Sequence, residues 1–176
     1  MTGTNAELAT LFLAFSRQKL LGQYWPRLCE TVAPLSDEQV WWRPNKASNS
    51  IGNLILHLNG NVHQWLVASF NREQDSRDRP AEFAASGEAT AANLLAKLGA
   101  TLDSAATVLD RLTAEELLAP YEIQGYHVRG LDAVYQVVEH FGLHYGQIIY
   151  IAKNLTGKDL GFYRDLSKTG RASVRV

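Results

Sequence analysis

Cysteine is almost absent from this chain of 176 residues, which contains only Cys29. A single cysteine excludes an intramolecular disulfide and any zinc site built on a cluster of cysteines. It is typical of a reducing compartment, or of a chain that needs no covalent cross-link for stability. We therefore expect a cytoplasmic protein.

An excess of charge of one sign is also lacking, because 17 lysines and arginines stand against 18 aspartates and glutamates. Without a basic stripe, binding to nucleic acid is not expected. Long hydrophobic runs are missing too. The apolar run at residues 8–15 is far shorter than the ~20 residues of a membrane helix, and no basic segment precedes it as in a signal peptide. We expect neither a nucleic acid nor a membrane as partner.

Proline, the residue that most reliably breaks helices, occurs only five times. Alternating strand patterns are hard to find, whereas the 3.6-residue helical period appears in four segments. We predict an all-α fold, a four-helix bundle that forms one domain over residues 1–176. The tail from about residue 164 to 176 is expected to be disordered.

The four helices are expected at residues 5–30, 49–70, 91–112 and 131–155. In the first, Leu8, Phe12 and Phe15 mark the line that faces the core, and Pro26 is expected to kink or end the helix. The third has the clearest seam of apolar residues. The polar segment at residues 71–87 is expected to be an exposed crossing loop.

Helix ends are also marked in the sequence. Ser36 and Thr113 each stand three residues before Gln or Glu, the spacing of a capping box, so both are expected to open a short extra helix. Asn49 or Ser50 is the expected N-cap of the second long helix, and Gly157 ends the fourth. The repeated capping boxes suggest two helix pairs related by a pseudo-twofold axis. Chance similarity is the alternative, because capping boxes are common.

The chemistry-bearing residues are five histidines. His140 and His144 lie one turn apart on one helix face, the spacing with which a helix offers two imidazoles to one metal ion. They share that face with Val137 and Ile148, so they are expected to point into the core. An unsatisfied polar group there costs roughly 1–3 kcal/mol. A hydrogen-bonded core histidine is the alternative for one such residue, but for this pair we favour a metal.

A metal requires at least a third ligand, and His57, His63 and His127 are the candidates. His57 and His63 lie on opposite flanks of the apolar stripe of the second helix, and periodicity does not choose between them.

Several neighbours of these histidines have possible roles. Glu139 is expected to face away from the metal, since it lies ~100° around the helix from His140. Gln147 is the better candidate for a hydrogen bond to the site. Asn61 either lines the same pocket or makes a capping or interhelical hydrogen bond. Trp41, Trp42 and Trp65 are expected in the core or an interface, although the adjacent pair cannot both face one core.

Two segments resemble the DinB-like superfamily, whose thiol-transferase members are called YfiT-like. Residues 50–58, Ser-Ile-Gly-Asn-Leu-Ile-Leu-His-Leu, resemble its first metal-ligand helix, and residues 139–148, Glu-His-Phe-Gly-Leu-His-Tyr-Gly-Gln-Ile, resemble its HxxxHxGQI helix. The resemblance covers essentially the whole chain. It implies a bundle in which His57, His140 and His144 bind one divalent metal, with His63 and His127 outside the triad.

Three neutral imidazoles leave a coordination position open, which is typical of catalytic metal sites. We expect zinc or nickel there, although imidazole sites also accept copper and iron. The expected function is that of a metal-dependent enzyme, an S-transferase or hydrolase, that activates a low-molecular-weight thiol or water for transfer to a small electrophile. Relatives in the superfamily resemble transferases that use bacillithiol or mycothiol, and one branch isomerises maleylpyruvate. Their thiol-recognising residues have no counterpart here.

Two other functions fit the same residues. One is a non-catalytic metal-binding or stress-response bundle, and the other is a purely structural bundle with a polar core pair and no metal. The resemblance and the exposed-looking aromatic residues further imply a homodimer.

Overall fold

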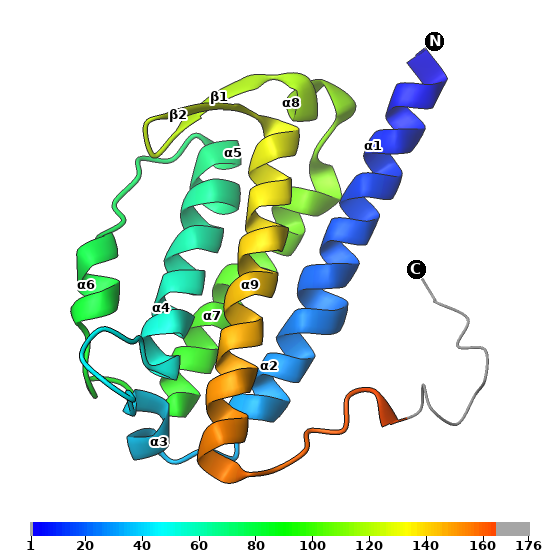
Figure 1. Cartoon of the computed structure of the whole chain (residues 1–176). Coiled ribbons are helices and arrows are strands. Elements are labelled where there is room, and N and C mark those ends of the chain that lie inside the picture. Colours follow the sequence, from blue (N-terminus) through cyan, green and yellow to red (C-terminus); the bar gives the residue numbers. More distant parts are fainter. Residues whose placement is uncertain (1, 165–176) are drawn as a thin grey trace.

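The computed structural model describes residues 2–164 of the chain (Figure 1). In chain order its elements, with η denoting a π-helical turn, are α1 (Thr2–Arg17), η1 (Gln18–Tyr24), α2 (Trp25–Val32), α3 (Asp37–Trp41), α4 (Ile51–Val62), η2 (His63–Ala68), α5 (Ser69–Asn71), α6 (Arg79–Ala84), α7 (Ala91–Arg111), α8 (Ala114–Leu118), β1 (Pro120–Ile123), β2 (Tyr126–Arg129) and α9 (Gly130–Thr156). The tail predicted from residue 164 lies almost entirely outside the described residues.

The predicted four-helix bundle is confirmed. Its long helical rods are α1–η1–α2, α4–η2–α5, α7 and α9, while α6 lies on the outside of α4 (Figure 1). A small antiparallel hairpin, β1–β2, closes one end together with α8. The hairpin was not predicted because strands of four residues are too short to show alternation. Its two-residue turn, Gln124-Gly125, has positive φ at both positions, as hairpin turns of this length require.

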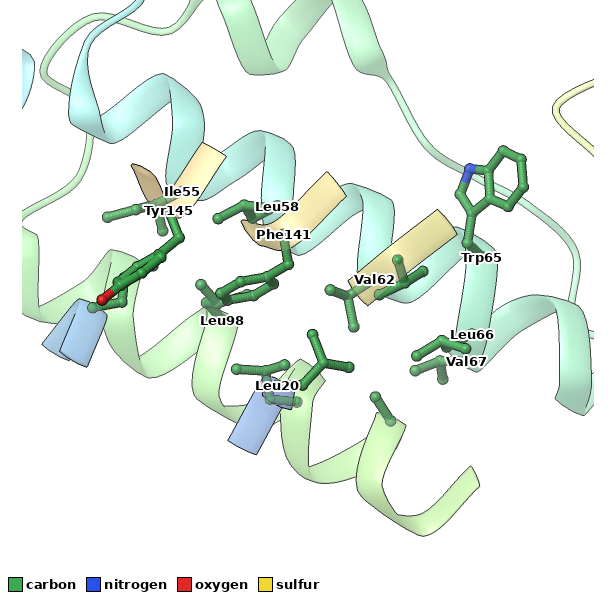
Figure 2. Packing of buried hydrophobic residues seen from close by; sticks show 14 of the residues in the cluster. Leu20, Ile55, Leu58, Val62, Trp65, Leu66, Val67, Leu98, Phe141 and Tyr145 are labelled. Atoms are coloured by element: carbon green, nitrogen blue, oxygen red, sulfur yellow. The ribbon is translucent and has the colours of Figure 1, made fainter. Parts of the chain in front are cut away.

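The core lies between α4, α7 and α9. Along α7, buried residues recur at three- and four-residue spacings, as the sequence predicted, and include Ala91, Leu98 and Leu102. Phe141 of α9 is fully buried among them, and Figure 2 shows its ring beside Leu58 and Leu98. The indole of Trp65 lies at the margin of this cluster and points away from it (Figure 2).

The predicted helix ends are confirmed. Capping boxes begin α3 at Ser36, α4 at Ser50 and α8 at Thr113. Gly157 follows α9 with a φ of 65°, the left-handed conformation of a helix C-cap.

The core line predicted for the first helix is wrong at its two ends, although Phe12 does pack against the core. Leu8 and Phe15 are exposed, and the buried line is Leu13, Ser16 and Leu20. The small Ser16 is tolerated inside because its hydroxyl donates to the Phe12 carbonyl oxygen at 2.7 Å. This helix carries apolar residues on all of its faces, so the helical period of the sequence could not identify the face that packs on the core.

The first rod also does not end at Pro26, the second position of α2. The π-helical turn η1 ends two residues before Pro26. The wider turn of its backbone accommodates the proline ring, whose nitrogen has no hydrogen to donate. A second π-helical turn, η2, extends α4, and residues 64–68 within it are all buried.

The exposed loop predicted at residues 71–87 is wrong in part, because it contains α6 and buried charged side chains. The Asn53 amide donates to the carbonyl oxygens of Glu82 and Ala85, both at 2.9 Å. The Arg43 guanidinium also donates to the Ala85 carbonyl oxygen, at 2.9 Å. These bonds hold α6 against α4, beside the candidate site.

Among the helices of residues 2–164, none combines the length and the apolar character needed to cross a membrane.

Candidate metal centre

Three histidines from two helices meet in the bundle. His57 comes from α4, whereas His140 and His144 lie one turn apart on α9. One ring nitrogen from each lies within 4.8 Å of the other two. Of the remaining histidines, His63 borders α7 and His127 is exposed on β2, so neither joins the group. The structure thus brings together the triad that the resemblance implied.

The donor set fits one divalent ion. His57 Nε2 and His140 Nε2 are 2.8 Å apart, a distance at which they share one proton. Nitrogen ligands of one zinc ion lie at most about 4.2 Å apart, since each zinc–nitrogen distance is ~2.0–2.1 Å. Small side-chain movements therefore suffice for an ion to replace the shared proton.

A buried carboxylate orients His57. The Nδ1–H of His57 donates to Glu82 Oε2 at 2.9 Å, which directs Nε2 toward the other two histidines. Arg77 donates to both oxygens of Glu82, from Nε at 2.7 Å and from Nη2 at 2.9 Å. Arg77 also donates from Nη1 to the amide oxygen of Gln64 at 2.9 Å, and the Gln64 amide donates to Asp75. The ligand is thus fixed by a hydrogen-bonded ion pair whose two side chains are 6% and 10% exposed.

Gly60 makes room for this pair. A Cβ atom there would lie 1.9 Å from Glu82 Oε1 and 2.7 Å from Arg77 Nε. Any larger residue on this face of α4 would push the carboxylate away from His57. Glycine inside a helix costs up to about 1 kcal/mol relative to alanine, and here the close approach of Glu82 requires it.

His144 is oriented from its own helix. Its Nδ1 lies 2.8 Å from the side-chain oxygen of Gln147, which confirms Gln147 as a hydrogen-bond partner of the site. Glu139 is exposed, as predicted. Each of the two helices that supply the triad therefore carries a histidine whose Nδ1 already has a hydrogen-bond partner.

Burial keeps the α9 imidazoles neutral. It lowers the pKa of His140 to about 4, and the neighbouring His144 and His57 act in the same direction. Burial also lowers the pKa of His144, against the raising effect of the Gln147 bond. Both rings are therefore in the protonation state that metal binding needs at neutral pH.

Glu82 stays ionised. Its partial burial favours the neutral acid, but the hydrogen bonds from Arg77 and His57 outweigh this and hold the pKa of Glu82 below its ordinary value. The carboxylate is thus an anion at neutral pH, the form that best supports a histidine ligand of a cation.

A pocket of about 390 Å³ adjoins the triad, with His57 and His140 in its wall. Asn61 and Trp65 line it too. Of the two roles considered for Asn61, lining the pocket is confirmed. Its buried side-chain oxygen has no hydrogen-bond partner among residues 2–164. Trp41 is half-buried and Trp42 exposed, as expected of an adjacent pair.

Glu82, Arg77 and Gly60 were missed from the sequence. Arg77 and Glu82 lie five residues apart in a polar segment, and nothing in that segment separates a buried pair from exposed charges. Gly60 did carry a signal, because an isolated glycine inside a helical pattern usually has a packing reason.

Comparisons with known proteins agree with this fold. No match is found among the curated proteins. A crystal structure of a conserved protein from Enterococcus faecalis superposes with a TM-score of 0.65 at 17% sequence identity, covering 87% of this chain and 98% of that one. The family model described as "Protein of unknown function (DUF1572)" matches residues 7–167. The chain therefore belongs to the DUF1572 family, which is DinB-like.

Proposed function

We propose that this protein is a metal-dependent enzyme that activates a low-molecular-weight thiol or water for transfer to a small electrophile, in the manner of YfiT-like transferases and hydrolases. The observation that carries this proposal is that two histidines of the triad, His57 and His140, lie in the wall of a pocket. A structural metal site is closed by four protein ligands, whereas a catalytic one keeps a position for water or substrate.

His57, His140 and His144 would hold one divalent ion, zinc or nickel by the all-imidazole donor set. Such an ion supplies Lewis acidity and lowers the pKa of a coordinated thiol or water. Glu82 and Gln147 fix the orientation of two ligands, and Arg77 fixes Glu82. In thiol transfer, a sulfur–carbon bond forms to the electrophile, the leaving group departs with its electron pair, and the thiol proton passes to solvent.

The nucleophile must come from outside the chain. Cys29 is the only cysteine, and burial raises the pKa of its thiol. A protonated thiol is a poor nucleophile. A cytoplasmic location, where small thiols are kept reduced, fits this requirement.

The direct test uses protein purified without a histidine tag. Elemental analysis should give one zinc or nickel ion per chain. Conjugation of bacillithiol to chlorodinitrobenzene should be accelerated by the loaded protein and return to the background rate after chelation. His144→Ala should eliminate the acceleration, and Cys29→Ser should retain it. A rate that survives chelation, or one that disappears in Cys29→Ser, contradicts the mechanism.

The second candidate is a non-catalytic metal-binding bundle, favoured by the rigid Arg77–Glu82 support around His57. In that case an ion would raise stability without turnover. Full metal occupancy with no rate across a panel of thiols and hydrolysable esters would select it.

We also propose a homodimer. Large apolar side chains are exposed on α1 (Leu8, Leu11 and Phe15) and at the start of α9 (Leu131 and Tyr135). These two rods lie side by side (Figure 1), and several large apolar side chains exposed on neighbouring helices are typical of an interface. Sedimentation at micromolar concentration should give a dimer, and Leu11→Glu should give a monomer. A wild-type monomer contradicts this proposal.

A further inference from the structure

The pocket beside the triad has an unusual charge composition. Its wall includes two arginines, Arg77 and Arg79, and no aspartate or glutamate. The rest of the wall is made of amide, aromatic and imidazole side chains, among them Gln124, Gln136 and Tyr126. Nothing in the wall itself neutralises a positive charge.

The two arginines differ in their partners. The charge of Arg77 is balanced by Glu82, which it contacts through two nitrogens. Within residues 2–164, Arg79 forms no ion pair, and its guanidinium lies over the ring of Phe83 at 5.0 Å. The Phe83 ring in turn packs on His57, with 4.7 Å between ring centroids. Arg79 is itself exposed, so this cation, which has no ion-pair partner in the described part of the chain, lies beside the triad and is open to solvent.

Two buried polar groups in the same wall have no partner in the described chain. They are the side-chain oxygen of Asn61 and the indole nitrogen of Trp65, whose residues are 4% and 6% exposed. A buried polar atom without a partner is destabilising. Because no protein bond fixes the Asn61 amide, it is free to turn either its oxygen or its nitrogen toward a ligand.

We propose that this pocket binds the carboxylate of a small organic acid, with Arg79 supplying the charge and Asn61 and Trp65 supplying hydrogen bonds. Guanidinium groups recognise carboxylates through paired, charge-assisted bonds. The volume of the pocket, about 390 Å³, lies in the range of small-molecule sites. The inference rests on the proposed function because it names the substrate class of the same site: a small acid whose reactive end faces the triad.

The aromatic side of the pocket guides the choice of probe. Trp65 and Tyr126 both line it, with their ring centroids 6.3 Å apart. A flat aromatic acid suits these walls. The test therefore compares 4-fluorobenzoate with 4-fluorobenzamide, which has nearly the same shape and no charge. Binding is followed by fluorine NMR on the full-length protein, both zinc-loaded and metal-free.

We expect 4-fluorobenzoate to bind at millimolar or lower concentration and the amide to bind about tenfold more weakly or not at all. Arg79→Gln should weaken benzoate binding about tenfold. The matched control is Arg72→Gln, which removes the same charge from an exposed arginine outside the pocket. It should leave the affinity unchanged.

Asn61→Leu separates a binding role from a structural one. It should weaken benzoate binding while leaving the melting temperature unchanged or higher, because it removes an unsatisfied buried group. A purely structural Asn61 would lower the melting temperature instead, and that outcome would remove Asn61 from the proposed site.

Equal affinity for the acid and the amide, equal losses in the two arginine variants, or no benzoate binding would each overturn the inference. None of these results bears on metal content, so the proposed function would stand or fall separately. Conversely, Arg79-dependent binding to a protein that takes up no stoichiometric metal would support the carboxylate site and contradict the metal-dependent function.

Discussion

Helices α4 and α7 pack against each other but bury different kinds of side chain. Every buried residue of α7 is apolar. The rod α4–η2 also buries polar residues at spacings of four, four and three, namely Asn53, His57, Asn61 and Gln64. This polar line faces α6 and α9, away from the seam with α7, and each member acts on the site or its support. The fold therefore depends on one buried face of α4, and the candidate chemistry on another.

The largest expected effect breaks the triad that the polar line helps to form. His140→Ala should abolish stoichiometric metal binding, because two imidazoles do not make a strong site. His63→Ala and His127→Ala, which change histidines outside the triad, should retain one ion per chain. Metal content by elemental analysis checks this. Full occupancy in His140→Ala would contradict the assignment of the site.

The next effect breaks the apolar face. Leu98→Ala removes a fully buried side chain from α7 and should lower the free energy of unfolding by about 2–5 kcal/mol. Leu95→Ala, on the same helix but only half-buried, should cost less. Denaturant titration gives both values. Metal stoichiometry should survive in Leu98→Ala, and its loss would show that the two faces are not separable.

A glycine pair sharpens the comparison. Gly60→Ala should displace Glu82 and Arg77 and weaken metal binding by about 10–100-fold, as expected when the support of a histidine ligand is lost. Gly146→Ala, where a Cβ meets nothing within 4 Å, should leave the affinity unchanged and raise helix stability by up to about 1 kcal/mol. Competition against a chromophoric chelator measures both affinities. Similar losses in the two variants would argue against a steric role for Gly60.

The smallest effect concerns pH. The pKa of His140 is about 4 in the folded, metal-free protein against an ordinary 6.5, so between these values the unfolded chain binds more protons. The stability of metal-free protein should therefore fall as the pH decreases from 6.5 towards 4. Melting temperatures across this window test the slope, which should become shallower in His140→Gln. An unchanged slope would mean that other groups dominate acid unfolding.

The apolar packing and the helix ends could be predicted from the sequence. The α7 seam, the caps at Ser36, Ser50 and Thr113 and the end at Gly157 all follow from local rules of spacing and capping. The inward direction of His140 and His144 followed from the same helical period. The choice of His57 over His63 did not, and it came from the family resemblance.

The residues that hold His57 in place could not be predicted in the same way. Arg77 and Glu82 are polar residues in a polar segment, and they are buried only because each neutralises the other against α4. Such burial depends on how this segment packs against α4, which is distant in sequence. The hydrophobic period of the segment itself carries no information about that packing. The exposed Leu8 and Phe15 show the converse error, since apolar character alone does not identify the packed face.

The π-helical turn η2 has an evolutionary consequence. A turn closed by bonds from residue i to i+5 holds one residue more than an α-helical turn, so loss of one residue would convert it to α-helix and leave the helix on either side in place. His57 precedes the turn and Trp65 lies within it. Deletion of one codon within the turn would therefore change the pocket wall around Trp65 while His57, His140 and His144 keep their positions.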